Sequence, residues 1–209
     1  MAHGSSNSRR VVILVKKDVD CTIHPKILDP LGQFIIVKAE IRDKMYVLIN
    51  IYAPNKDANI VSFLNNLLVT LQNNNLDEEE NIIMGGDFNC PLNPSIDKKG
   101  GLLNPGKAVI STIGNLQEEV DLVDIWRVKN PEKKSFTWNQ NSLVIFCRLD
   151  YWLISSALHD LLKVTDIIPA FRTDQSAITL EFVNTLDNVK GPGVWKINCS
   201  LLDDEESVK

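Results

Sequence analysis

The segment Gly85–Asn89, with the sequence GGDFN, contains residue types that hydrolytic sites use, and it directly follows a short apolar run. Asp87 and Asn89 are two positions apart, so on extended backbone both side chains would project from the same face. A carboxylate there could take a proton from water or help to hold Mg²⁺, and an amide could donate to a phosphate oxygen. Gly, Asp and Asn are also turn residues, and the segment alone favours a simple turn.

Two further segments place polar residues at the ends of expected strands. Asp150 lies in the otherwise apolar run 148–154, where a buried carboxylate needs a partner. In the purely structural alternative, that partner is Arg148 or a residue of a neighbouring strand. The stretch 173–176 interrupts two strands with Thr, Asp, Gln and Ser and could again be an ordinary turn. Three polar strand ends in one chain predict a shared rim.

Hydrophobic periodicity indicates the elements that would position these residues. Residues 33–41 and 46–52 alternate with a period of two on either side of a polar turn, which predicts an antiparallel hairpin. Apolar residues at helical spacing predict helices at 59–72 and 106–120 and a short one at 156–162. About eight strands and three helices favour a mixed α/β fold, with two β-sheets packed face to face and helices outside. The further strands are predicted at 11–15, 81–84, 135–138, 148–154, 164–168 and 177–183.

Composition narrows the class of protein. The 209 residues are 44% hydrophobic and 23% charged, which is typical of a globular chain with one core. The net charge is −5, but without the acidic runs 77–80 and 203–206 the chain has 22 basic residues against 19 acidic ones, which permits a polyanionic partner. No apolar run reaches the roughly 18 residues of a membrane span. We therefore expect an intracellular protein, nuclear or cytoplasmic, with no membrane partner.

The organisation of the chain is expected to be simple. Residues 1–10 are polar and are expected to be a disordered N-terminus, and residues 11–183 are expected to form the domain. Residues 184–209 lose their periodicity and turn acidic, which indicates a linker or tail. The four cysteines are far apart in sequence, which predicts neither a zinc site nor a disulfide framework.

Several motifs together resemble the endonuclease/exonuclease/phosphatase family, and most closely the endonuclease domain of non-LTR (LINE-type) retrotransposon polyproteins. They occur in family order from about Val11 to Phe182, and each is weak alone. The resemblance implies a four-layer, deoxyribonuclease-like sandwich and Mg²⁺-dependent hydrolysis of a phosphodiester in DNA. The motifs are LINIYAPN at 48–55, GGDFNCPL at 85–92, DLVDIWR at 121–127, FTW at 136–138, RLDYWLI at 148–154 and TDQSAI at 173–178.

The resemblance implies a role for each matching position. Tyr52 would contact the scissile phosphate, and Asp87 would orient or deprotonate the attacking water. Asn89 would bind the phosphate beside Asp87, and Thr137 would lie near the nucleic-acid groove. Asp150 would hold the catalytic histidine of the family in its working tautomer. These roles agree with the need for a metal and for donor groups around a phosphorane that gains negative charge.

The last motif departs from the family pattern. The family has Ser-Asp-His, whereas this chain has Thr173, Asp174 and Gln175. Asp174 matches the acidic residue close to the metal, so Asp87 and Asp174 are the expected Mg²⁺ ligands. Gln175 replaces a histidine with an amide that carries no charge and no transferable proton. Losing such a group slows a reaction by about 10²–10⁴-fold. The three histidines of the chain are expected at the surface, away from the site: His3, His24 and His159.

A second departure concerns the first strands of the family, which carry an Asn and the metal-ligating Glu and have no match here. The chain is therefore expected to be N-terminally truncated, to bind Mg²⁺ weakly and to self-associate through an uncovered sheet edge. These features predict a degenerate DNA endonuclease with little or no nicking activity. Two alternatives stay open: an active metal-dependent hydrolase in which Gln175 binds phosphate, and a non-catalytic module that binds nucleic acid.

Overall fold

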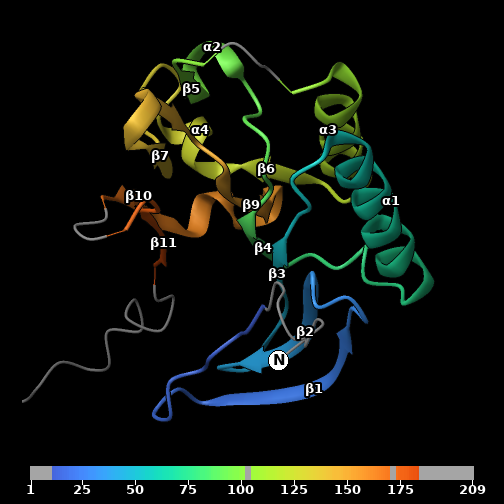
Figure 1. The fold of residues 1–209 in the computed structure, drawn as a ribbon. Coiled ribbons are helices and arrows are strands. Elements are labelled where there is room, and N and C mark those ends of the chain that lie inside the picture. Colours follow the sequence, from blue (N-terminus) through green and yellow to red (C-terminus); the bar gives the residue numbers. More distant parts are fainter. Residues whose placement is uncertain (1–10, 102–104, 170–172, 184–209) are drawn as a thin grey trace, which may run out of the picture.

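Six strands form the main sheet of the computed structural model, which describes residues 11–101, 105–169 and 173–183 (Figure 1). All neighbouring strands run antiparallel except β3 and β4, which are parallel and are connected through helix α1 (Asp57–Asn73). The predicted hairpin of residues 33–41 and 46–52 is confirmed as β2 and β3. The expected N-terminal region 1–10 and tail 184–209 lie outside the described residues. In sheet order the strands are β1 (Cys21–Leu28), β2 (Phe34–Ile41), β3 (Lys44–Tyr52), β4 (Ile82–Asp87), β9 (Asp150–Ser155) and β6 (Leu122–Asp124).

Helices α1 and α3 (Lys107–Glu119) cover one face of the main sheet, on the right of Figure 1. Both were predicted from helical spacing, at 59–72 and 106–120, and both are confirmed. Alternate residues of the central strands point toward the helices and, with their apolar stripes, form the largest core cluster. The carboxylate of Asp57 in α1 accepts a hydrogen bond of 2.6 Å from the backbone N–H of Gly106, which joins the beginnings of the two helices. The helices bury Ile60, Phe63, Leu64, Leu67, Leu71, Val109, Ile113 and Leu116.

The opposite face of the main sheet meets a second sheet of two strands, β10 (Leu162–Ile168) and β11 (Ala177–Phe182). Ile83 and Ile154 of the main sheet share a core cluster with Leu180 and Phe182 of β11. The predicted mixed α/β fold with sheets packed face to face is therefore confirmed. The short 3₁₀ helix η2 (Ser156–Leu161), close to the helix predicted at 156–162, connects β9 to β10.

A third sheet of short strands extends from the beginning of β9, at the upper left of Figure 1. Its order is β5 (Lys98–Lys99), β8 (Ile145–Cys147) and β7 (Trp138–Gln140). The strand predicted at 135–138 overlaps β7 by a single residue, and strands of two or three residues carry too little periodicity to predict. The connections contain α2 (Pro94–Asp97), α4 (Ile125–Lys129) and the 3₁₀ helix η1 (Asn141–Leu143).

The N-terminal strand prediction is wrong. Residues 12–15 have no strand structure, and the first strand is β1, where no strand was predicted. The apolar run 11–15 misleads because only part of it serves tertiary packing. Val11 and Ile13 pack in the cluster of Ile35, Val37 and Ala39, whereas Leu14 and Val15 are exposed. β1 lacks an alternating pattern because it is an edge strand with a bulge around Pro25. A proline and a bulge both oppose pairing between exposed edges. The predicted self-association stays a prediction.

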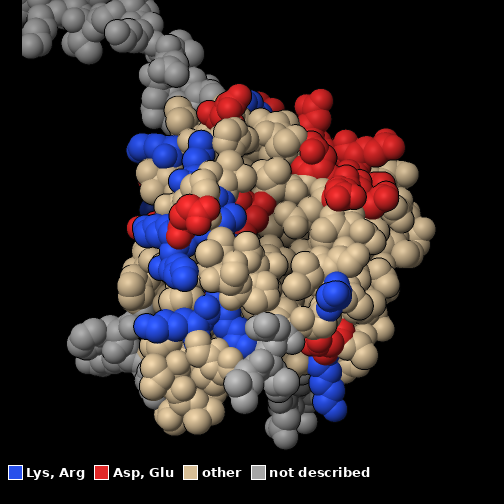
Figure 2. All heavy atoms as spheres, turned by 90° about the horizontal axis from the view of Figure 1, so that it is seen from above, with Lys and Arg blue, Asp and Glu red and all other residues tan. Residues whose placement is uncertain are grey.

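Charged side chains are unevenly distributed over the surface. Figure 2, which looks down on the molecule from above the view of Figure 1, shows most Lys and Arg side chains on the side of the third sheet. Asp and Glu side chains gather on the other side of the same view. Within the described residues, no helix combines the length and the hydrophobicity that crossing a membrane would require.

Candidate functional site

Three polar residues from three adjacent strands form a row across the main sheet. In the strand register Tyr52 of β3 lies opposite Asp87 of β4, and Asp87 lies opposite Asp150 of β9. Directly paired residues project from the same face of a sheet with Cβ atoms about 5 Å apart. Strand pairing thus places the Asp87 and Asp150 carboxylates side by side on the face opposite to the two helices.

Burial and mutual repulsion oppose ionisation of this carboxylate pair. Asp87 is 7% exposed. Its burial, together with the neighbouring Asp150, raises the pKa of Asp87 to about 7, although a hydrogen bond from the Asn89 backbone acts in the opposite direction. Burial also raises the pKa of Asp150. Oδ2 of Asp150 is buried without a hydrogen-bond partner among the described residues. Such a pair retains a proton near neutral pH or attracts a cation.

Asn89 reaches this site by a different route from the one predicted. The argument from extended backbone is wrong, because β4 ends at Asp87 and Asn89 has a left-handed conformation with φ of 51°. The Asn89 backbone N–H donates to Asp87 Oδ1 at 2.8 Å, which makes the segment the turn that its residue types favour. The Asn89 side chain donates to the carbonyl oxygen of Ala53 at 2.6 Å. Asn89 therefore braces Asp87 against the end of β3.

Thr137 is completely buried, at 0% exposure, which leaves it no surface for direct contact with nucleic acid. Its hydroxyl oxygen accepts hydrogen bonds from the backbone N–H groups of Leu149 and Asp150, at 2.9 and 3.1 Å. Thr137 therefore cannot bind nucleic acid directly, and its predicted position near the groove stays a prediction. Thr137 fixes the first residue of β9 and, with it, the position of the Asp150 carboxylate.

Replacing the Thr137 hydroxyl with a methyl group is expected to destabilise the fold. Thr137→Val keeps the shape of the side chain but leaves two amide donors without an acceptor, and each unsatisfied buried donor costs about 1–3 kcal/mol. Thr112→Val is the matched control, because the Thr112 hydroxyl is exposed and donates only to its own helix. Urea denaturation should give a free energy of unfolding at least about 1 kcal/mol lower for Thr137→Val. Equal values for the two variants would contradict this role.

Asp174 and Gln175 are held against β7. The indole N–H of Trp138 donates to Asp174 Oδ2 at 3.2 Å, and the backbone N–H of Asn139 donates to the Asp174 carbonyl at 2.9 Å. Gln175 forms an isolated β-bridge with Trp138, and its side chain is exposed. In the part of the chain that the structure describes, no hydrogen bond joins Gln175 to Asp150. The expected metal ligation by Asp174 and phosphate contact by Gln175 stay predictions.

The described histidines form no contact with the carboxylate pair. His24 Nε2 lies 3.8 Å from the carboxylate of Glu40, and His159 Nδ1 lies 3.1 Å from that of Asp160. His3 lies outside the described residues. Asp150 therefore has no histidine partner among residues 11–101, 105–169 and 173–183.

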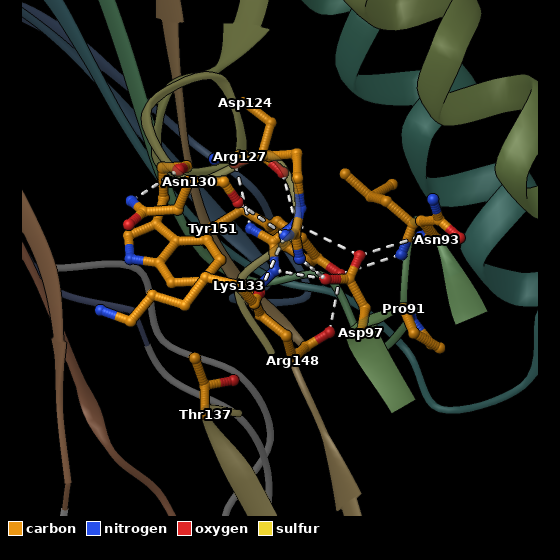
Figure 3. Close-up of polar contacts among 12 residues, drawn as sticks. Pro91, Asn93, Asp97, Asp124, Arg127, Asn130, Lys133, Thr137, Arg148 and Tyr151 are labelled. Atoms are coloured by element: carbon orange, nitrogen blue, oxygen red, sulfur yellow. Dashed lines mark hydrogen bonds and ion pairs between the residues drawn. The ribbon is translucent and has the colours of Figure 1, made fainter. Parts of the chain in front are cut away.

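Arg148, one structural alternative for the partner of Asp150, instead belongs to a separate buried network (Figure 3). Its guanidinium binds the carboxylate of Asp97 at 2.8 and 3.2 Å and that of Asp124 at 2.5 and 3.0 Å. Arg127 completes the network with a 2.5 Å bond to Asp97 Oδ1. Arg148 is 1% exposed and Asp97 0%. Two positive and two negative charges thus compensate one another inside the protein.

This network fastens the loop after Asp87 to the beginning of β9. The Tyr151 hydroxyl, whose ring lies 4.3 Å from the Arg148 guanidinium, accepts from the backbone N–H of Leu92 and contacts the carbonyl of Cys90. The backbone N–H of Arg148 donates to the Asp97 carbonyl at 2.8 Å. Both catalytic candidates, Asp87 and Asp150, therefore lie beside a rigid, internally neutral support.

A cavity of about 470 Å³ lies next to the carboxylate pair, between the main sheet and β11. Its wall is mostly apolar and includes Leu48, Ile83, Trp152 and Ile178, with Asp150 as a polar element. The indole N–H of Trp152 is buried without a hydrogen-bond partner among the described residues. The candidate site therefore consists of the carboxylate pair at the edge of a cavity whose wall is largely apolar.

Comparison with known proteins agrees with this architecture. The 3′-5′ exonuclease NExo from Neisseria meningitidis has a TM-score of 0.57 and 19% identity, covering 78% of this chain and 71% of that one. An AP endonuclease from Archaeoglobus fulgidus has a TM-score of 0.60 and 18% identity, covering 79% and 70%. The AP endonuclease LMAP from Leishmania major has a TM-score of 0.57 and 17% identity, covering 75% and 56%. The chain has the endonuclease/exonuclease/phosphatase fold.

A protein that is similar to this chain in sequence comes from a mobile element. The Transposon TX1 uncharacterized 149 kDa protein of Xenopus laevis is 28% identical over 183 residues. That alignment covers 85% of this chain but only 13% of the relative. No family model matches the chain. The endonuclease/exonuclease/phosphatase fold is thus combined here with a sequence related to a transposon protein.

The described residues of this endonuclease/exonuclease/phosphatase-fold chain contain no group of three or more His, Cys, Asp or Glu side chains that could hold an ion. Mg²⁺ usually keeps several waters and is bound through one or two carboxylates. Asp87 and the unpartnered Asp150 Oδ2 could supply those two oxygens, with little further support from the protein.

Sequence reasoning missed three features around the site of this fold. The Asp97–Arg127 part of the buried network has no local pattern, because its members are distant in sequence. Trp152 was assigned only to an apolar strand, yet its ring lies where a Cβ on Gly85 would collide with it, which explains that glycine. Asn50, a polar residue within a β-branched strand, was a usable signal: its side chain donates to the carbonyl of Val12 at 2.9 Å.

Proposed function

We propose that the chain is a nuclease domain of transposon origin that binds DNA and whose catalytic centre is impaired. Support for the nuclease class comes from the fold, from the likeness to a transposon protein and from the row of Tyr52, Asp87 and Asp150 at one edge of the cavity. The observation that carries the impairment is the buried Asp150 Oδ2, which has no partner in the described residues. At position 175 the family resemblance implies a catalytic histidine held by Asp150, whereas this chain has Gln175.

The chemistry of the residues gives the site a limited capacity. Asp87, with its pKa raised to about 7, has a basicity suited to accepting a proton from water near neutral pH. The attack of water on phosphorus also needs stabilisation of the charge that develops on the phosphoryl oxygens. The described residues place no Arg or His in a hydrogen bond or ion pair with Asp87 or Asp150. We propose that Mg²⁺, if it binds, is held weakly at Asp87 with Asp150 or Asp174.

Relaxation of supercoiled plasmid in Mg²⁺ tests this proposal. We expect the wild-type chain to nick no faster than Asp87→Ala, and Gln175→His to stay at the same level. A new imidazole would supply an acid, but the described residues would still contain no group of three or more potential metal ligands. Losing a positioned charge stabiliser costs about 10²–10³-fold, so restoring one group of several leaves the rate low.

The raised pKa of Asp87 favours one alternative, an active hydrolase with an altered site. In that case the wild-type chain would nick well above Asp87→Ala, and Asp174→Ala would abolish the activity. Such a result would overturn the impairment while retaining the nuclease class. A rise in nicking with Gln175→His alone would show that the metal site is more complete than proposed.

A further inference from the structure

The surface beside the buried network carries a cluster of lysines, here called the lysine patch: Lys98, Lys99, Lys129, Lys133 and Lys134. Lys98 and Lys99 form the edge strand β5, Lys129 ends α4, and the other two follow in the loop before β7. Arg127 brings these parts together, because its guanidinium binds Asp97, which directly precedes Lys98, and also the backbone carbonyl of Lys133 at 2.9 Å. Figure 2 shows Lys and Arg side chains concentrated on this side of the molecule.

Four lysines of the lysine patch keep a positive charge that no acidic side chain of the described residues pairs with: Lys99, Lys129, Lys133 and Lys134. Asp97 and Asp124, the buried acids beneath it, are already compensated by Arg127 and Arg148 (Figure 3). In the described ranges, no salt bridge involves Lys99, Lys129, Lys133 or Lys134. All four of these lysines are exposed. The loop between α4 and β7 contains one acidic residue, Glu132. The protein therefore maintains a net positive surface here, although its total charge is −5.

The lysine patch is held in a defined shape. Arg127 also donates to the backbone carbonyls of Asn130 and Pro131, at 2.9 and 3.1 Å, which fixes the loop that presents Lys133 and Lys134. Lys99 Nζ lies 5.7 Å from the ring of Phe146, and Lys133 Nζ lies 6.0 Å from that of Trp126. Side chains resting on rings lose less conformational freedom when they bind.

The lysine patch also adjoins the candidate site. Lys98 pairs with Cys147 in the third sheet, and Cys147 precedes Asp150 by three residues. An extended chain spans about 3.3–3.6 Å per residue, so roughly 10 Å of backbone separates the two positions. A double helix carries one phosphate charge per about 1.7 Å of its axis, so a duplex at the carboxylate pair would bring several phosphates to the lysines.

We propose that the lysine patch is the surface that grips the phosphate backbone of duplex DNA next to the carboxylate pair. The inference rests on the proposed function for the identity of the polyanion. Lysines in such a surface bind phosphates as point charges, release counterions and give an affinity that falls steeply with salt, without selecting a base sequence. They act in binding alone and take no part in bond cleavage.

Fluorescence anisotropy with a labelled DNA duplex of about 20 base pairs, in EDTA and over about 50–200 mM salt, tests this proposal. The variant is the triple substitution Lys99→Gln, Lys133→Gln and Lys134→Gln. The control removes the same charge elsewhere, through Lys26→Gln, Lys44→Gln and Lys56→Gln, which are exposed lysines of β1, β3 and the turn before α1. Thermal unfolding of both variants checks that the fold is retained.

We expect the patch variant to lose about 0.9 from the slope of log affinity against log salt for each lost phosphate contact, a total of about 2–3. Its affinity at about 100 mM salt should fall by at least tenfold, and the control should stay within about threefold of the wild type. Equal losses of DNA affinity in the two variants, or an unchanged affinity of the patch variant, would contradict DNA binding by the lysine patch. The proposed function would be unaffected. Absence of any salt-dependent binding by the wild-type chain would overturn the DNA partner itself. Nicking by the wild-type chain would leave the lysine patch untouched and would refute only the impairment.

Discussion

Arg148→Met is expected to lower the free energy of unfolding by about 3–5 kcal/mol, because it leaves two buried carboxylates without their main charge partner. Asp97 and Arg148 are at 0% and 1% exposure, so water cannot replace the lost interactions. The guanidinium also lies 4.3 Å from the Tyr151 ring and 5.1 Å from the Trp126 ring, contacts that methionine fills only in part. A loss of this size is a large share of the roughly 5–15 kcal/mol that stabilises a typical domain.

The matched control for Arg148→Met is Lys16→Met. Lys16 forms a 2.8 Å ion pair with Asp18, but their side chains are 80% and 67% exposed, and such pairs contribute about 0–1 kcal/mol. Urea denaturation at neutral pH gives both values. A triple variant that adds Asp97→Asn and Asp124→Asn should recover part of the loss, since it removes the uncompensated charges. If Arg148→Met were no more destabilising than Lys16→Met, the network would not support the site as described.

Asp87→Asn is expected to stabilise the protein above pH 7. The pKa of Asp87 is raised from 3.8 to about 7 by burial and by Asp150, so between these values the folded state holds a proton that the unfolded chain has released. Stability of the wild-type protein therefore falls as pH rises from about 4 to about 7. Asparagine does not titrate, and its side-chain oxygen can still accept the hydrogen bond from the Asn89 backbone. The variant should match the wild type near pH 4 and exceed it by about 2–4 kcal/mol at pH 8.

Asp20→Asn is the control for this pH dependence, because Asp20 is exposed and takes part in no ion pair among the described residues. Denaturation curves measured in EDTA at a series of pH values should give parallel profiles for Asp20→Asn and the wild type. A wild-type profile that does not fall between about pH 4 and 7 relative to Asp87→Asn would contradict the raised pKa.

The sequence predicted those parts of the fold whose residues are consecutive and periodic. The hairpin β2–β3 and helices α1 and α3 follow from alternation and from 3.6-residue spacing. β1 was missed because an edge strand with a bulge has no buried face to impose alternation. The third sheet was missed because its stability comes from neighbours and not from its own residues. In each case tertiary contacts outweighed local pattern.

The candidate site was predictable to a similar extent. Asp87 and Asp150 were predicted because each is a polar residue at the end of an apolar strand, where functional side chains are often found. The orientation of Asn89 was not predictable, because a left-handed residue breaks the alternation on which the argument relied. The burial of Thr137 was also hidden, since one polar residue between two aromatic ones fits a groove as well as a core. Pairing between distant strands decided both questions.

The pairing of β4 with β9, which brings Asp87 and Asp150 together, determines when the carboxylate pair forms during folding. Its stabilising bond from the Ile82 backbone to the Ser155 hydroxyl joins residues 73 positions apart. Closing so long a loop lowers the conformational entropy of the chain before the favourable contacts have formed. Such pairings therefore form later than hairpins do. During synthesis, the carboxylate pair cannot assemble until β9 has left the ribosome, long after β4. The carboxylate pair is thus a late product of folding.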